Sequence, residues 1–137
     1  MRYLIIGLLL FCFTGCDLTK RPKTSEEYTD RALKEMAEND YGAADSDFSM
    51  ALMLKADNMV ALFGLSLVKK LEKDYKVALK FSTIGIQSNP LFRGRFLNLR
   101  GEIRREMGDK DSACIDFNAA GNLGDTTAFS NLNKYCR

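Results

Sequence analysis

One pattern of four residues occurs three times in this chain and constrains its fold more than any other feature. The pattern has offsets 0, 3, 7 and 10, and each copy follows the one before after 34 or 35 residues. The copies are Tyr41-Ala44-Phe48-Ala51, Tyr75-Ala78-Ser82-Gly85 and Lys110-Ala113-Phe117-Ala120. These offsets line one face of a helix, and a period of this length is typical of a helical solenoid. The sequence therefore predicts an all-α chain of stacked helical hairpins.

Capping and turn signals divide the chain into seven predicted helices. Thr24 and Glu27 form a capping box, Pro90 ends a helix, and Asp125 is the predicted N-cap of the last helix. The predicted helices span residues 25–38, 41–55, 58–72, 75–88, 91–107, 110–122 and 126–135. We therefore expect an α-solenoid of about three hairpins plus a C-terminal capping helix, because the exposed end of a solenoid must be covered.

These residues resemble the tetratricopeptide repeat (TPR), a 34-residue helix–turn–helix unit. The family's order of small residue, aromatic, small residue and proline is matched by Ala44-Phe48-Ala51, with Ala56 in place of the proline. The second unit, Ala78-Ser82-Gly85-Pro90, has a serine in place of the aromatic, and the third ends in Ala119-Ala120-Gly121, which resembles the Sel1-like repeat. The resemblance implies a repeat domain over residues 25–137, with units at about 25–58, 59–93 and 94–127 and the capping helix at 126–135.

The resemblance also implies a concave groove, because in this family the first helix of each hairpin lines one. Carried over by register, the groove would run from mildly acidic and apolar, through apolar, to basic. Beside Glu26 and Thr29 it would comprise Leu33, Met36, Val60, Phe63, Leu67, Lys70, Arg95, Asn98, Glu102 and Arg105. For Leu33, Phe63 and Leu67 a place in the core is the alternative. An apolar middle with polar edges suits an extended peptide or a helix of another protein.

Some members of the family hold a C-terminal carboxylate with Lys and Asn at fixed groove positions. Here the first unit has Thr29 and Leu33 instead. The resemblance therefore does not imply that activity for this chain.

The first residues of the chain have the features of an export signal. Residues 1–3 carry one positive side chain, residues 4–13 are an almost unbroken apolar run, and Thr14-Gly15 precede Cys16. The run is too short to cross a bilayer. The small residues before a cysteine resemble the lipobox of bacterial lipoproteins, although Phe13 stands where Leu is usual. The resemblance implies a signal peptide of residues 1–15, a lipid such as palmitate on Cys16, and a tether over residues 16–24. An ordinary secretory signal is the alternative.

Composition argues against several classes of function. The chain has no histidine, which is the commonest general base and metal ligand. It also lacks a Gly-rich phosphate loop, a Cys-x-x-Cys pair and a nucleophile elbow. Its formal net charge of +2 is too small for bulk electrostatic binding to nucleic acid. We therefore expect a protein that is not an enzyme and that uses no metal, cofactor or nucleic acid.

Two cysteines remain in the exported chain after Cys16. Cys114 lies on the sixth predicted helix and Cys136 follows the last one. Because an exported chain meets an oxidising compartment, we expect the two thiols to form a disulfide that pins the capping helix to the last hairpin. Two buried free thiols, or a redox pair, are the alternatives.

Together these features predict a lipid-anchored module of a bacterial cell envelope that binds a protein partner in its groove. The outer membrane is favoured, with the repeat domain in the periplasm or at the cell surface. A structural accessory lipoprotein, similar to a pilotin, that helps assemble an outer-membrane complex is the alternative. A thiol-redox protein is the least favoured alternative.

Overall fold

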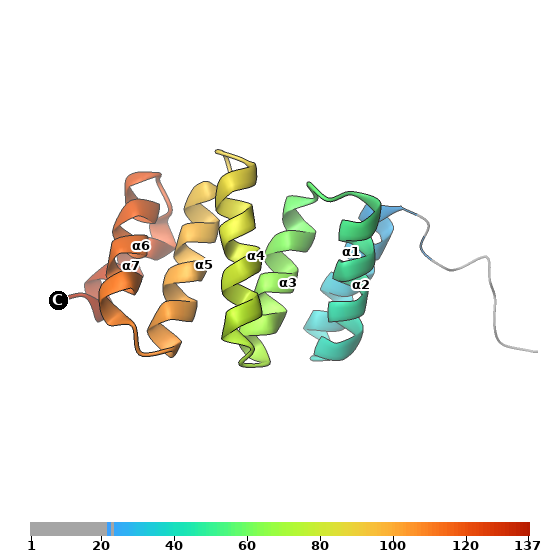
Figure 1. The fold of residues 1–137 in the computed structure, drawn as a ribbon, viewed down its shortest axis with the longest axis horizontal. Coiled ribbons are helices and arrows are strands. Elements are labelled where there is room, and N and C mark those ends of the chain that lie inside the picture. Colours follow the sequence, from blue (N-terminus) through green and yellow to red (C-terminus); the bar gives the residue numbers. More distant parts are fainter. Residues whose placement is uncertain (1–21, 23) are drawn as a thin grey trace, which may run out of the picture.

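The computed structural model describes residue 22 and residues 24–137, and this part of the chain consists of helices joined by short turns. The helices are α1 Ser25–Ala37, α2 Tyr41–Leu54, α3 Met59–Leu71, α4 Tyr75–Ser88, α5 Arg93–Glu106, α6 Lys110–Asn122 and α7 Thr126–Tyr135. They form three hairpins, α1–α2, α3–α4 and α5–α6, stacked side by side with α7 at the far end (Figure 1). The predicted all-α solenoid with a terminal helix is confirmed.

The predicted signal peptide and Cys16 lie outside the described residues. Within the part of the chain that the structure describes, no helix is both long enough and apolar enough to cross a bilayer.

Side chains at the N-termini explain where most of the helices begin. The predicted capping box is present before α1, where Glu27 N–H donates to Thr24 Oγ1 at 3.1 Å. Asp125 accepts from the Ala128 N–H, which confirms it as the N-cap of α7. The helix α5 has no side-chain cap and begins at Arg93, two residues later than predicted. The difference arises because Leu91 belongs to a turn, in which its N–H donates to the Asn89 side chain at 2.9 Å.

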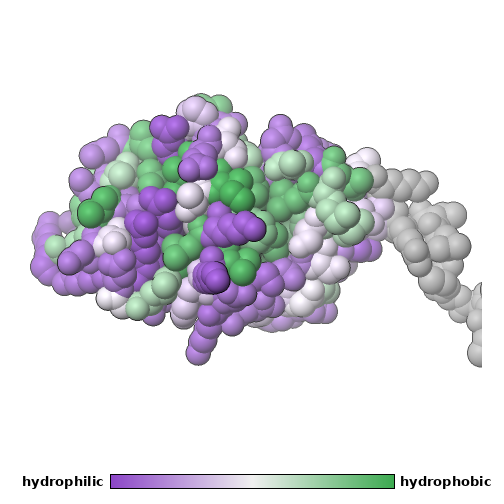
Figure 2. All heavy atoms as spheres, in the orientation of Figure 1, coloured by the Kyte–Doolittle hydropathy of each residue, from purple (hydrophilic) through white to green (hydrophobic). Residues whose placement is uncertain are grey.

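The odd-numbered helices form the inner face of the stack. Along the stack α1 contacts α3 and α3 contacts α5, whereas the even-numbered helices make at most marginal contact with one another within the described residues. A stack whose odd-numbered helices are closer together curves toward them. On the side shown in Figure 2, hydrophobic residues gather over the middle of the stack and hydrophilic residues predominate at the end formed by α6 and α7.

The third hairpin supplies the core aromatic that the second hairpin lacks. In the first hairpin Phe48 is fully buried, and a Cβ added to Gly64 of α3 would lie 2.2 Å from its ring. At the equivalent position of the second hairpin stands Ser82, whose hydroxyl donates to a backbone carbonyl of its own helix. The ring of Phe96 in α5 is fully buried against Gly85, where a Cβ would lie 2.2 Å from Cε1. The interface between the second and third hairpins therefore still contains a buried aromatic ring, although Ser82 stands at the aromatic position.

An ion pair between exposed Arg31 and buried Asp47 joins the two helices of the first hairpin. The Arg31 guanidinium donates to both carboxylate oxygens of Asp47, which is 4 % exposed. Hydrogen bonds in which both partners are charged are among the strongest in proteins. The same contact raises the pKa of Arg31, so the guanidinium stays protonated at every practical pH.

The third hairpin repeats this arrangement and extends it. Arg100 donates to Asp116 at 2.9 and 2.8 Å, and Arg104 adds a third hydrogen bond at 2.8 Å. Asp116 is 1 % exposed. In both hairpins the arginine precedes its aspartate by 16 residues. The second hairpin has Leu65 and Phe81 at the equivalent positions, so apolar side chains replace the ion pair there.

Glu35 lies beside the Arg31–Asp47 pair and should make stability depend on pH. Burial, followed by the negative charge of Asp47, raises the pKa of Glu35 above its ordinary value of 4.5. A carboxyl with a raised pKa in the folded state binds its proton more tightly there, so folding becomes less favourable as pH rises through that range. Glu35→Gln should therefore raise the melting temperature at pH 7, and the gain should disappear below about pH 4.5.

Melting curves of both proteins at several pH values test this expectation. Glu38→Gln is the matched control, because Glu38 is exposed at the end of the same helix. A gain for Glu35→Gln that is equal at low and neutral pH would show that burial of charge is not its cause.

The capping helix packs on the last hairpin through a small apolar contact and a covalent bond. Ala128 of α7 is fully buried in a cluster with Leu97 and Ala120. The structure joins Cys114 of α6 to Cys136, which follows α7, by a disulfide with a Cα–Cα distance of 5.7 Å. This bond fixes the end of α7 to the third hairpin.

Alkylation of the exported protein tests the pairing of Cys114 with Cys136. Under denaturing but non-reducing conditions we expect neither cysteine to react with iodoacetamide, and both to react once the protein is reduced. Peptide mass spectrometry reads the two sites separately. Alkylation of both thiols before reduction would show that the bond does not form in the exported chain.

Candidate functional site

The ten candidate groove residues all come from α1, α3 and α5, the helices of the inner face. The structure therefore brings them together on one side of the stack. It also divides them into an apolar half on α1 and α3 and a polar half made of Lys70 of α3 and the four candidates of α5. The side chains of the two halves differ in exposure.

The apolar half contains a hollow between α1 and α3. Leu33 and Val60 are 44 % and 46 % exposed, and both line a hollow of about 390 Å³. Aliphatic side chains left this open on an inner face are available to a ligand. The remaining lining residues are Glu26, Thr29, Asp30, Lys55, Asp57, Asn58, Met59 and Phe92.

The rim of this hollow is acidic. Lys55 pairs with Glu26 at 3.1 Å. Asp30 and Asp57 take part in none of the ion pairs found among the described residues. The hollow therefore presents an apolar wall with uncompensated negative charge around it.

The other apolar candidates are half-buried. Met36 packs on the core of the first hairpin, while Phe63 and Leu67 pack against Leu99 of α5. Phe63 also meets the ring of Phe96 edge to face, with centroids 5.5 Å apart. Phe63 and Leu67, for which the sequence left a place in the core open, therefore support the interface between hairpins while staying partly exposed on the inner face.

In the polar half, three candidates are bound to one another. Lys70 donates to Glu102 at 2.6 Å, and its side chain is only 12 % exposed. Asn98 donates to Glu102 at 3.3 Å and accepts from Asn131 of α7 at 2.9 Å. Asn98 is 8 % exposed, so it does not lie on an open surface as its register position implied. The cause is α7, which covers it.

Two candidate arginines lie in different surroundings. The Arg105 guanidinium stacks on the ring of Tyr135 at 4.6 Å, and such a cation–π contact holds its charge in place. A hydrogen bond from Lys134, with the charges of Lys134 and Arg105, lowers the pKa of Tyr135. Arg95 is exposed and belongs to none of the ion pairs among the described residues. Of the two, Arg95 is the more accessible to a ligand.

Sequence reasoning treated α7 only as a cap and missed its part in the inner face. Asn131 and Tyr135 both contact residues of α5. A signal was present, since Asn131 follows Asn98 after 33 residues, which is close to one repeat. The helix thus behaves as the first helix of a fourth unit.

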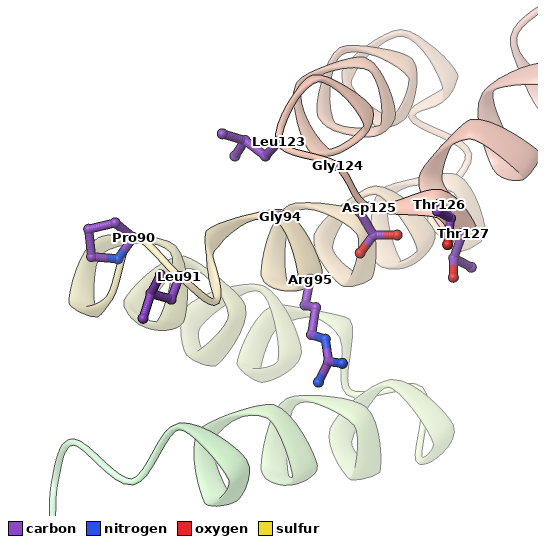
Figure 3. A pocket seen from close by; sticks show the side chains of 9 residues that line it. All are labelled: Pro90, Leu91, Gly94, Arg95, Leu123, Gly124, Asp125, Thr126 and Thr127. Atoms are coloured by element: carbon purple, nitrogen blue, oxygen red, sulfur yellow. The ribbon is translucent and has the colours of Figure 1, made fainter.

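A second hollow, of about 450 Å³, lies where α5 and α7 begin. Figure 3 shows Pro90 and Leu91 on one side of it, Leu123 on another, and Arg95 extending from α5. This hollow lies between α5 and α7 in the same way that the first hollow lies between α1 and α3. The two hollows therefore lie at opposite ends of one inner face, the first with acidic residues on its rim and the second with Arg95 beside Asp125.

The described residues contain no cluster of three or more His, Cys, Asp or Glu that could hold a metal ion. What the inner face offers to a ligand is two hollows with charged residues beside them.

Comparison with solved structures identifies the fold. No protein-family model matches the sequence, and no curated protein matches it either. Among solved structures, PcrH from Pseudomonas aeruginosa is 19 % identical, with a TM-score of 0.76 over 82 % of this chain and 92 % of that chain. The type III secretion chaperone SycD of Yersinia enterocolitica, solved with a peptide of the translocator YopD, is 18 % identical, with a TM-score of 0.70 over 79 % and 82 %.

A further similar structure is the first TPR of Spaghetti (RPAP3) bound to an HSP90 peptide. It is 16 % identical, with a TM-score of 0.75 over 82 % of this chain and 90 % of that chain. At these identities the likeness concerns the backbone. The chain has the fold of a TPR solenoid.

Proposed function

We propose that the inner face binds an extended peptide or a helix of a partner protein, and that the chain does so as a lipid-anchored module of a bacterial cell envelope. The observation that carries the proposal is the open apolar wall of Leu33 and Val60 beside the partly exposed side chains of Phe63 and Leu67. Leu33 and Val60 face the same hollow, so their exposed surfaces form one apolar wall. Two of the similar structures hold peptides, which supports the same use of the fold here.

The charges along the groove indicate the character of the peptide. Asp30 and Asp57 surround the hollow at the α1 end, and Arg95 lies at the α5 end. Complementary charges orient a ligand and exclude wrong partners more than they add affinity. We therefore expect a peptide with apolar side chains in its middle, a basic residue near α1 and an acidic residue near α5.

Selection of displayed random peptides tests the binding function. We expect peptides of this character to be enriched on residues 24–137 and to lose at least about ten-fold in affinity when Leu33 and Val60 are both changed to Glu, since buried charge is costly. Lys80→Glu on α4 is the control, because this exposed residue lies on an even-numbered helix. Peptides that bind the groove variant as well as the native protein would move the site elsewhere.

The anchoring part has a separate test. Cys16→Ser should release the protein from the membrane fraction into the soluble fraction of the cell envelope. Unchanged fractionation would contradict lipid attachment at this residue while leaving the groove unaffected.

A further inference from the structure

The turns that join one hairpin to the next all lie at the same edge of the stack (Figure 1). The hollow at α1 and α3 is lined by Lys55 and Asp57 of the α2–α3 turn together with Phe92 of the α4–α5 turn. The second hollow is lined by Leu91 of the α4–α5 turn and Leu123 beside the α6–α7 turn. The three turns therefore form one continuous edge, which we call the hairpin-joining edge.

This edge carries large apolar side chains that contact little of the protein. Leu91 is 89 % exposed at the tip of its turn, Met53 and Leu54 at the end of α2 are 79 % and 53 % exposed, and Leu123 is 54 % exposed. Single exposed leucines are ordinary on protein surfaces. Here, however, each of the three turns has at least one such side chain in it or directly beside it. Exposed apolar residues are therefore a feature of the whole edge.

The opposite edge has a different composition. The turns inside the hairpins there span residues 38–40, 72–74 and 107–109, and Met107 is their one large apolar residue. Its exposed apolar side chains are Leu71, the last residue of α3, and Met107 of the α5–α6 turn. They are 44 % and 50 % exposed, less than any of the four side chains on the hairpin-joining edge. Turns that face water usually consist of polar residues and glycine.

The N-terminal segment enters the domain at the hairpin-joining edge. Ser25 opens α1, and its hydroxyl donates to Ala51 near the end of α2 at 2.9 Å. The Asn58 side chain in the α2–α3 turn donates to that hydroxyl at 2.8 Å. Thr24 lies eight positions after Cys16, a length of at most about 26–29 Å when fully extended. A lipid on Cys16 would therefore be attached to the domain at this edge.

We propose that the hairpin-joining edge rests on the lipid bilayer, with Leu54, Leu91 and Leu123 in the interfacial layer. This inference rests on the anchoring part of the proposed function. A short tether gives the edge an effective concentration at the membrane in the millimolar range or above, so weak partitioning by a few leucines is sufficient. Arg93 on the same edge is exposed, belongs to none of the ion pairs among the described residues, and can meet a lipid phosphate. The stack of hairpins then lies parallel to the membrane.

Tryptophan fluorescence tests this orientation, because the chain contains no tryptophan. Residues 16–137 are coupled through Cys16 to maleimide-headgroup lipid in phosphatidylethanolamine–phosphatidylglycerol vesicles, so the result does not depend on lipidation in the cell. Leu91→Trp reports on the hairpin-joining edge, and Met107→Trp is the matched control on the opposite edge. On coupling, we expect the emission of Leu91→Trp to move to shorter wavelength and to lose most of its intensity in vesicles of brominated lipid. Met107→Trp should do neither.

A second variant separates membrane contact from chance proximity. Adding Leu54→Ser and Leu123→Ser to Leu91→Trp should reduce its quenching toward the level of Met107→Trp, with unchanged helix content by circular dichroism. Equal quenching of the two single tryptophans, or none for either, would overturn the proposal. So would quenching of Leu91→Trp that the two serines leave unchanged.

Discussion

Replacing Phe96 by alanine should lower the free energy of unfolding by about 3–5 kcal/mol, the usual cost of removing a buried ring from a core. Phe96 is fully buried and stands in the cluster that joins the second and third hairpins, with Met59 and Leu62. Phe63 and Phe81 of the second hairpin pack against the same cluster but are only partly buried, so Phe96 is its one fully buried ring. Denaturant unfolding followed by circular dichroism measures the loss.

Phe129→Ala is the matched control for this prediction. Phe129 belongs to α7 and is 49 % exposed, so its removal should cost at most about 1 kcal/mol. If both variants lose equal stability, the interface between the second and third hairpins does not depend on the buried ring.

Gly85→Ala provides a more demanding test of the same contact. In the native protein the added methyl would overlap the ring of Phe96, so we expect a loss of about 1–3 kcal/mol from overpacking. In the Phe96→Ala background the ring is absent, and alanine is a better helix former than glycine by about 0.5–1 kcal/mol. The sign of the effect should therefore reverse. An equal loss in both backgrounds would show that Gly85 is required for a reason other than the ring.

Replacing Asp116 by alanine should lower the free energy of unfolding by about 2–4 kcal/mol. The substitution leaves Arg100 and Arg104 without the carboxylate that accepts three hydrogen bonds from them, and breaking a buried ion pair is costly because a charge remains unpaired. The side chains of the two arginines are 19 % and 27 % exposed and can turn partly to water, which keeps the loss below that of a fully buried pair.

Asp111→Ala on the same helix is the control for Asp116→Ala. Asp111 is exposed in the first turn of α6, so its loss should change stability by no more than about 0.5 kcal/mol. The two variants can be compared in one set of urea titrations. A loss at Asp116 as small as that at Asp111 would mean that water compensates the arginines in the folded state.

The repeat period and the caps could be predicted because each depends on a few residues close in sequence. Thr24 with Glu27 and Asp125 with its following helix are local signals, and every helix begins and ends within two residues of the predicted position. The inner face followed from the same period, since it places α1, α3 and α5 on one side.

The details of the groove depended on contacts between distant residues and could not be predicted in the same way. Register alone placed Asn98 in the open, because it contained no information on Asn131, which lies 33 residues further on and covers it. The ion pairs of Asp47 and Asp116 were missed for a related reason. A charged residue on a helix is usually solvated, and only the equal spacing of 16 residues in two hairpins distinguishes these aspartates.

The claim that the inner face is the binding surface is tested most directly by site-specific photocrosslinking in intact cells. A benzophenone side chain is introduced at Leu33, Val60 or Leu67 on the odd-numbered helices, and at Lys80 or Ile115, which are exposed on the even-numbered ones. We predict that the three inner positions capture the same protein and that the two outer positions do not. Capture only from Lys80 or Ile115, or from no inner position, would contradict the assignment of the groove.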